Sequence, residues 1–223
     1  MQKKKSRLEL FRRWLFLVAS LFVMAAGVAC SIQANLGTSP ISSVPYAVSR
    51  FTPLTVGTAT IALHCALILI QILLLRRRYD PVQLLQLPVA IVFGYLTDLA
   101  LWLVGFFQPT AYWQQLLLCL IGIALVGVGV SGEVTAHVVT LAGEGVVLAV
   151  CQVTPMKFGT MKVAFDMTLV VIACALSLVF LGHLVGVREG TVAAALLVGQ
   201  VARRVNRRLE PLDCWLSSDL SDR

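Results

Sequence analysis

Few side chains in this sequence can do chemistry, and most of them lie inside long apolar stretches. His64 and Asp166 occupy equivalent places in a segment that the chain contains twice, because each follows a glycine by seven residues. An imidazole or a carboxylate inside a membrane is costly unless it faces a partner or a water-filled path. The pair therefore predicts a role in proton transfer or in substrate contact.

A purely structural alternative exists for both residues. Lys162 lies one helical turn before Asp166, at the spacing at which two side chains of one helix meet. This alternative is an ion pair within the helix, with His64 as a hydrogen-bonded packing residue. Asp98 is a further acid within an apolar stretch, and we expect it either to pair with Arg188 or to reach the membrane surface.

The chain consists of two related halves. The segment Thr52–Thr58 returns as Thr154–Thr160 at an offset of 102 residues. Upstream, Gly27 and Ser31 return at an offset of 100 residues. In a chain that is 58% hydrophobic, with a mean hydropathy of +0.87, this long period is typical of transporters built from two copies of one helical bundle.

Charge-poor stretches mark six candidate membrane spans. They cover residues 14–35, 54–75, 82–107, 112–131, 158–182 and 186–202. The last is marginal, because only thirteen uncharged residues separate Glu189 from Arg203. With six crossings, most Lys and Arg residues fall on one side, so the positive-inside rule predicts that both termini are cytoplasmic.

The predicted fold is an all-α membrane protein with six transmembrane helices in two three-helix repeats. Because three is an odd number of crossings, the second repeat is inverted relative to the first. The predicted organisation is a basic cytoplasmic N-terminus (1–13), repeat 1 (14–107), repeat 2 (108–202) and a cytoplasmic C-terminal tail (203–223).

A short helix follows the first span of the first repeat. Gly37 and Thr38 precede Ser39, which suits an N-cap, and Pro40 suits the first helical position. The predicted helix covers residues 40–51 and is too short to cross the bilayer.

The second repeat has an equivalent short helix over residues 143–153. Gly143, Glu144 and Gly145 form its start, and the rest is more apolar than an exposed linker. Both short helices are either interfacial helices or half-helices that enter the membrane from opposite sides. In the second case their N-termini point at a common site that favours an anion or a polar acceptor, and Glu144 is either a cap or a coupling acid.

Several functional classes are disfavoured by composition. The net charge of +7 comes from short basic runs beside the apolar stretches, which is a topological pattern and does not indicate nucleic-acid binding. The six cysteines contain no CxxC pair, so neither a metal site nor a disulfide framework is expected. No hydrolase or nucleotide-binding motif is present, and we expect neither an enzyme nor a cofactor.

Glycine-based motifs carry a resemblance to a known family. They are Ala34–Pro40 followed by Thr55–Thr58 in the first half, and Gly143–Gly145 followed by Phe158–Thr160 in the second. Over about residues 14–205 the chain resembles the YczE/YyaS/YitT-like family of bacterial multi-pass inner-membrane proteins. The resemblance implies a bacterial inner-membrane location, and it implies no catalytic residues.

These observations together predict a secondary transporter or permease of a small polar or anionic metabolite. The predicted substrate-binding or coupling residues are Thr38, Ser39, His64, Glu144, Lys162 and Asp166. The alternative is a membrane helper that transports nothing and binds a partner protein or lipid. The expected partners are the lipid bilayer and a small molecule, and a homo-oligomer is left open.

Overall fold

The chain is a multi-pass helical membrane protein. The computed structural model describes residues 7–217, and this part contains helices and no strand. The helices are α1 (Arg7–Gln33), α2 (Pro40–Ser49), α3 (Val56–Leu75), α4 (Gln86–Val104), α5 (Tyr112–Ala136), α6 (Ala142–Val153), α7 (Phe158–Leu181) and α8 (Glu189–Ser217); the 3-10 turns η1 (Arg76–Arg78) and η2 (Pro81–Leu85) precede α4. Five of them, α1, α3, α4, α5 and α7, are long and apolar enough to cross a membrane.

The sixth predicted span is the first part of α8. This helix does not end near residue 202 but continues through the basic segment to Ser217, and the last predicted tail residues, 218–223, lie outside the described part. α8 runs along α5: Gly190 packs beside Cys119, and the hydroxyl of Thr135 donates a hydrogen bond to Asn206 Oδ1 at 3.2 Å.

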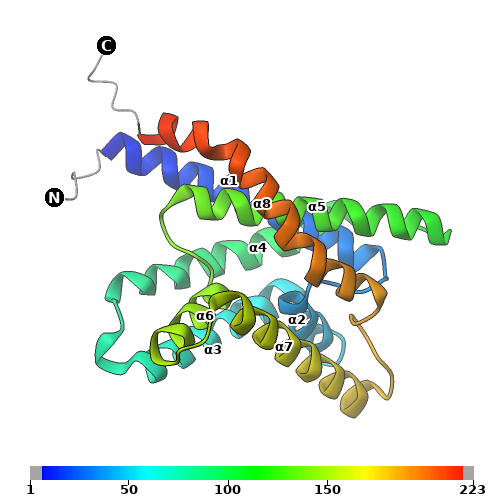
Figure 1. Cartoon of the computed structure of the whole chain (residues 1–223). Coiled ribbons are helices and arrows are strands. Elements are labelled where there is room, and N and C mark those ends of the chain that lie inside the picture. The colour runs from blue at the N-terminus through cyan, green and yellow to red at the C-terminus, as the bar shows by residue number, and fades with distance from the viewer. Residues whose placement is uncertain (1–6, 218–223) are drawn as a thin grey trace.

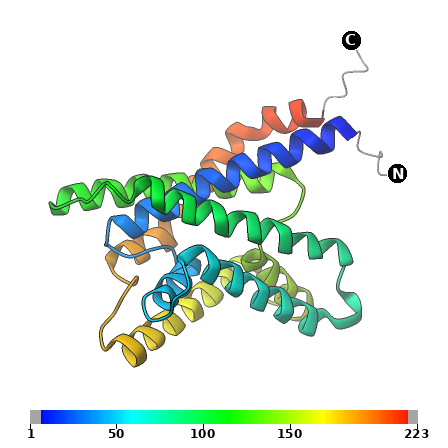
Figure 2. The ribbon, with the colours of Figure 1, turned by 180° about the vertical axis from the view of Figure 1, so that it is seen from behind.

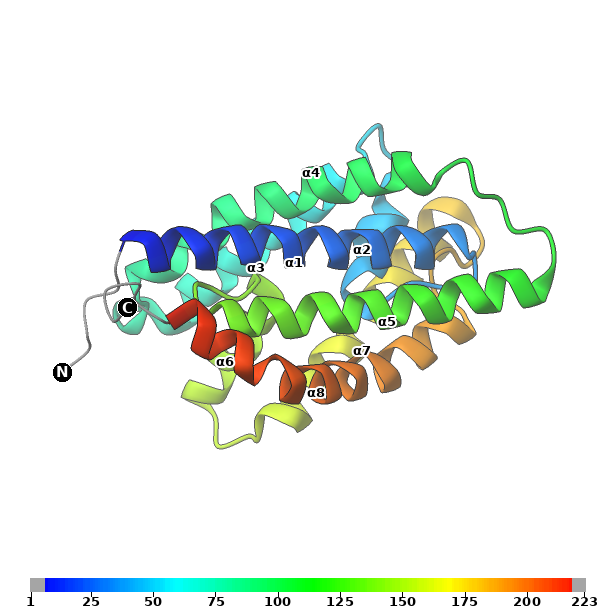
Figure 3. The same cartoon turned by 90° about the horizontal axis from the view of Figure 1, so that it is seen from above.

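The long helices form two layers. Figure 3 shows α4, α1, α5 and α8 side by side in that order, and each neighbouring pair is packed together. The second layer contains α3 and α7 with the short helices α2 and α6 (Figure 1). The start of α1 and the end of α8 lie at the same end of the first layer, which Figure 2 shows from behind.

The centre of the first layer is a close antiparallel contact between α1 and α5. Near one end Gly132 lies against Ser20, and near the other Gly122 lies against Gly27 and Ser31. Arg13 at the start of α1 donates a hydrogen bond to the carbonyl of Ala136, the last residue of α5, at 3.1 Å. Small residues let the backbones approach, and this replaces the hydrophobic driving force that is absent between helices in lipid.

The backbone repeats itself at the offset of 102 residues. Asn35 after α1 and His137 after α5 both adopt left-handed conformations, with φ of 55° and 48°. The residues that precede the short helices, Ser39 and Leu141, have nearly identical dihedrals of −61°, 150° and −61°, 154°. The prediction of short helices at 40–51 and 143–153 is confirmed by α2 and α6.

Each of the two short helices packs against long helices of both halves. α2 packs on α7 of the second half as well as on α3, and α6 packs on α3 of the first half as well as on α7. At the far end of α2, the rings of Phe51 and Phe180 stack with centroids 4.5 Å apart. Both helices are buried along much of their length, so they are internal elements and not surface linkers.

The outer helices of the two halves differ. In the first half Gly57 lies against the backbone of Gly94, and Asp98 accepts hydrogen bonds from the amide of Gly57 at 2.7 Å and the hydroxyl of Thr55 at 2.6 Å. Asp98 therefore caps α3, and the expected pairing with Arg188 was wrong. In the second half nothing lies within 4 Å of a Cβ built on Gly159, the equivalent of Gly57.

This difference predicts opposite effects for one substitution at two equivalent positions. A methyl group at residue 57 meets the backbone of α4 and the Asp98 carboxylate, so Gly57→Ala should lower the free energy of unfolding by about 1–3 kcal/mol. Gly159→Ala should leave it unchanged or raise it slightly, because alanine favours a helix. Thermal unfolding of the purified protein in detergent measures both, and equal losses at the two positions would contradict the packing described above.

Candidate functional site

The starts of α2 and α6 meet at the centre of the second layer. The Cδ1 atom of Ile41 occupies the space that a side chain at Gly143 would need. Ala142, Val146 and Val147 continue this contact into an apolar cluster that reaches α3 and α7. The starts of the two short helices are thus brought together, through an apolar contact.

The start of α2 is held by the loop between α7 and α8. The amide of Thr38 donates a hydrogen bond to the carbonyl of Gly186 at 3.0 Å. Gly37 has a φ of 105° and lies against Thr191, so a side chain there is excluded both by conformation and by space. Ser39 is the N-cap residue as predicted, but its hydroxyl donates to Ser42 Oγ at 2.9 Å and caps no amide.

The start of α6 is held by a carboxylate from another helix. Glu133 on α5 is only 2% exposed, and its Oε1 atom accepts a hydrogen bond from the amide of Leu141 at 2.5 Å. Because an N-terminal helix turn has unpaired amides and the positive end of the helix dipole, a carboxylate is favoured there. The protein itself therefore supplies the hydrogen-bond acceptor at this helix start.

A pair of buried amides packs against the same turn. The side-chain nitrogen of Gln71 donates to Gln86 Oε1 at 3.0 Å and to the carbonyl of Ala142 at 3.1 Å. Gln71 is fully buried, and its Oε1 atom has no hydrogen-bond partner. A Cβ at Gly145 would lie only 2.7 Å from that oxygen, so the glycine predicted at the half-helix start is required for this close approach.

Three of the predicted site residues form one charged group. Lys162 Nζ donates to Asp166 Oδ1 at 2.7 Å on α7, which is the ion pair of the structural alternative. Glu144 on α6 interacts electrostatically with both of them, and Glu133 interacts with Glu144. Carboxylates thus outnumber the one lysine in this group.

His64 is placed apart from that group. It is 1% exposed, and its ring lies edge-on to Phe93 of α4 with centroids 6.1 Å apart. Its Nδ1 atom has no hydrogen-bond partner. Because α2 and α6 pack between α3 and α7, the structure does not bring His64 and Asp166 together.

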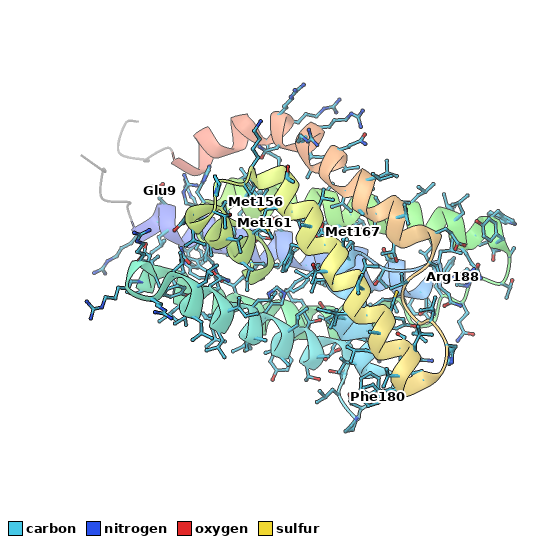
Figure 4. All side chains as sticks on the ribbon, turned by 60° about the horizontal axis from the view of Figure 1, so that its bottom comes forward. Glu9, Met156, Met161, Met167, Phe180 and Arg188 are labelled. Atoms are coloured by element: carbon cyan, nitrogen blue, oxygen red, sulfur yellow. The ribbon has the colours of Figure 1, made fainter. Side chains whose placement is uncertain are left out.

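Two polar pockets flank the short helices, at opposite ends of the bundle. The α6 pocket has a volume of about 230 Å³ and lies near the end that holds the termini; it is lined by Leu75, Val82, Gln83, Gln86, Val138, Val139, Thr140, Gly145, Leu148, Ala149 and Gln152. The α2 pocket has a volume of about 510 Å³; it is lined by Ile32, Gln33, Asn35, Tyr46, Ser49, Arg50, Val56, Leu101, Gln108, Pro109 and Gln115. In Figure 4, Glu9 marks one of these two ends, and Arg188 and Phe180 lie toward the other.

The two pockets are lined by equivalent residues of the two short helices. Tyr46 and Arg50 of the α2 pocket correspond, at the offset of 102, to Leu148 and Gln152 of the α6 pocket. α4 contributes to both, with Gln86 at one end and Leu101 at the other. Neither pocket lies between the two half-helix starts.

Sequence reasoning missed the residues that organise α6. Gln71 interrupts an otherwise apolar stretch of α3, and a single polar residue in such a stretch is a signal that could have identified it. Glu133 matches Gln33 at the offset of 100, but no pattern in the chain shows that it reaches α6. Among the described residues, no group of three or more His, Cys, Asp or Glu side chains is arranged to hold a metal ion.

Removing the Glu133 side chain should destabilise α6. Glu133→Ala leaves the amide of Leu141 unpaired in a buried place, and we expect a loss of about 1–3 kcal/mol. Glu133→Gln keeps an oxygen acceptor of the same length and should lose less. Thermal unfolding gives the stabilities, and hydrogen exchange of a peptide covering residues 137–153 should be faster in the alanine variant. Unchanged exchange in that peptide would show that the carboxylate does not hold the helix start.

Comparisons with known proteins give the family. The sequence pattern of DUF6198, a family of unknown function, matches residues 11–207. An uncharacterized protein of Haemophilus influenzae is 24% identical over 187 residues, which cover 84% of this chain and 80% of that protein. The uncharacterized protein YyaS of Bacillus subtilis is 30% identical over 121 residues, which cover 52% of this chain and 57% of YyaS.

No solved structure matches the chain. The relationship to YyaS agrees with the resemblance drawn from the glycine motifs. Since the family match spans nearly all of the helical bundle, the chain belongs to the DUF6198 family and is related to YyaS.

Proposed function

We propose that this protein is a secondary transporter, or permease, of a small polar or anionic metabolite in the bacterial cytoplasmic membrane. The observation that carries the proposal is the meeting of two half-helices, α2 and α6, from equivalent places in two related halves, with a polar pocket beside each at opposite ends. Transporters built from inverted repeats place broken helices and their substrate sites in this way.

The proposed topology has six crossings, two inverted repeats and both termini in the cytoplasm. The antiparallel packing of the equivalent helices α1 and α5 supports the inversion. The packing of α8 along α5, from Cys119 to Thr135, supports a sixth crossing although α8 is not among the five apolar helices. The basic residues near the shared end of the termini support the cytoplasmic assignment.

The proposed coupling residues are Glu144, Lys162 and Asp166. Their position at the contact between α6 and α7 joins a short helix of the second half to a long one. A change in the charge of this group alters the energy of that contact, which is how binding of a proton or a charged solute can bias one conformation. His64 on α3 is buried against Phe93 of α4 in the first half. We propose it as a separate coupling or gating residue.

The difference between the outer helices suggests how the conformation changes. α4 is closed onto α3 at Gly57, whereas α7 is free of α8 at Gly159. In this proposal each half alternates between the closed arrangement seen at Gly57 and the open one seen at Gly159. When one half closes and the other opens, one pocket closes and the other opens. The apolar contact of Ile41 with Gly143 is then the barrier between the pockets.

One observation favours the second candidate function, a membrane helper without transport. The contact between the half-helix starts is apolar and closed, and a scaffold for a partner protein or lipid needs no path through its centre. Neither candidate is an enzyme. The two differ in whether a solute crosses a sealed membrane that contains only this protein.

Flux into proteoliposomes tests the transport proposal. The full-length protein is reconstituted in sealed vesicles and supplied with labelled organic acids, amino acids and phosphate, with a pH-sensitive dye inside. We expect uptake of at least one solute above that of empty vesicles. His64→Ala and Asp166→Asn should abolish this flux or uncouple it from protons, because the first removes a buried ionisable group and the second a half-buried one.

Matched controls are available at exposed positions. His183→Ala and Asp80→Asn make the same chemical changes at exposed side chains and should leave flux unchanged. All four variants must insert and unfold at temperatures close to that of the unchanged protein. If no solute is taken up, the helper becomes the better proposal; if flux persists in both His64→Ala and Asp166→Asn, Lys162 and Asp166 form a structural ion pair only.

A further inference from the structure

The α2 pocket is the larger of the two pockets and contains a charge that the other lacks. Its volume of about 510 Å³ falls in the range of roughly 300–1,000 Å³ that is usual for small-molecule sites. It opens at the end of the bundle away from the termini, between α1, the end of α2, the end of α4 and the loop before α5.

The lining of this pocket is polar, and its one charged side chain is a cation. The amides of Gln33, Asn35, Gln108 and Gln115 line it together with the hydroxyl group of Ser49. Two of the amides are anchored, because Gln33 donates to the carbonyl of Gly105 at 3.4 Å and Gln115 to that of Pro109 at 3.5 Å. None of the described residues that line the pocket is acidic.

The charge is the guanidinium of Arg50, which is exposed, and no acid of the described residues is paired with it. It lies 6.0 Å from the centre of the Tyr46 ring, a contact that orients it without neutralising it. No carboxylate of the described residues forms an ion pair with it, whereas the neighbouring Arg188 bonds to Glu189 at 3.3 Å and to the carbonyl of Asn35 at 3.0 Å. Asp98, the other nearby acid, is engaged in capping α3.

Comparison of the halves shows that the fold itself does not require this arginine. Gln152 lies at the equivalent place in the α6 pocket, and α6 ends there without a cation in its last turn. The aromatic ring of Tyr46 is likewise replaced by Leu148. The cation and its aromatic support are thus features of one pocket, whereas the amide-rich lining is common to both.

We propose that the α2 pocket binds a small organic anion, a monocarboxylate with further hydrogen-bonding groups, whose carboxylate is held by Arg50. A guanidinium binds a carboxylate through two parallel hydrogen bonds, and the surrounding amides suit hydroxyl or amino groups on the rest of the molecule. A single cation with neutral neighbours balances one negative charge, which favours a monocarboxylate over phosphate. The inference deepens the proposed function and rests on it only where it calls this anion the substrate.

Binding to the purified full-length protein in detergent tests the site without any requirement for transport. Lactate, glycerate and gluconate serve as probes, and their neutral amides serve as matched ligands without the charge. We expect at least one carboxylate to raise the unfolding temperature in a saturable way and its amide to have no effect. Calorimetry then gives the dissociation constant.

Variants at Arg50 decide whether this side chain holds the ligand. Arg50→Gln, which copies the residue of the α6 pocket, should weaken binding about tenfold or more, because a charged hydrogen-bonded pair is lost. Arg50→Lys should keep part of the affinity, since the charge remains without the forked geometry. Arg77→Gln makes the same change at another exposed arginine, which lies in η1 at the other end of the bundle, and should bind like the unchanged protein.

The same measurements separate the other outcomes. Equal binding of carboxylates and amides, unchanged affinity in Arg50→Gln, or no binding of any probe overturns the proposal. Stabilisation by phosphatidylglycerol micelles or inorganic phosphate, with none by the carboxylates, assigns the pocket to a phosphate group and also overturns it. Binding without vesicle flux keeps the site and removes transport, so the two proposals fail separately.

Discussion

Burial of a helix start inside an apolar bundle is the constraint on which the centre of this structure depends. A helix that begins within the protein has unpaired amides at its first turn, and no lipid group can bind them. The chain meets this need from elsewhere in the fold: Glu133 accepts from Leu141, and the carbonyl of Gly186 accepts from Thr38 just before α2. Each short helix is therefore tied to an element of the opposite half or of a different layer.

Close packing of small residues supplies the frame around those helices. The antiparallel contact of α1 with α5, through Gly27 and Gly122 and through Gly132 and Ser20, brings the two halves together at their equivalent first helices. α4 and α8 extend the same layer on its two sides. The order of helices in this frame is symmetric, and the differences between the halves lie in the contacts of the outer helices and at the pockets.

Those differences give the two halves distinct properties. α3 is closed onto α4 and capped by Asp98, while the equivalent glycine of α7 has open space. The α2 pocket contains Arg50 where the α6 pocket contains Gln152. The start of α6 is occupied by a carboxylate, whereas hydroxyl groups surround the start of α2. At each of these related places, therefore, one half carries an ionisable group where the other carries a neutral one.

The sequence by itself located most of the elements and showed the internal repeat of its motifs. Apolar length and glycine and proline positions located the long helices and both short ones, because these signals are local. It could not determine that Asp98 caps α3, that Glu133 caps α6 or that Gln71 and Gln86 meet, because each contact joins segments that only tertiary packing brings together. The separation of His64 from Asp166 was decided by the same packing: α2 and α6 lie between the two helices that carry them.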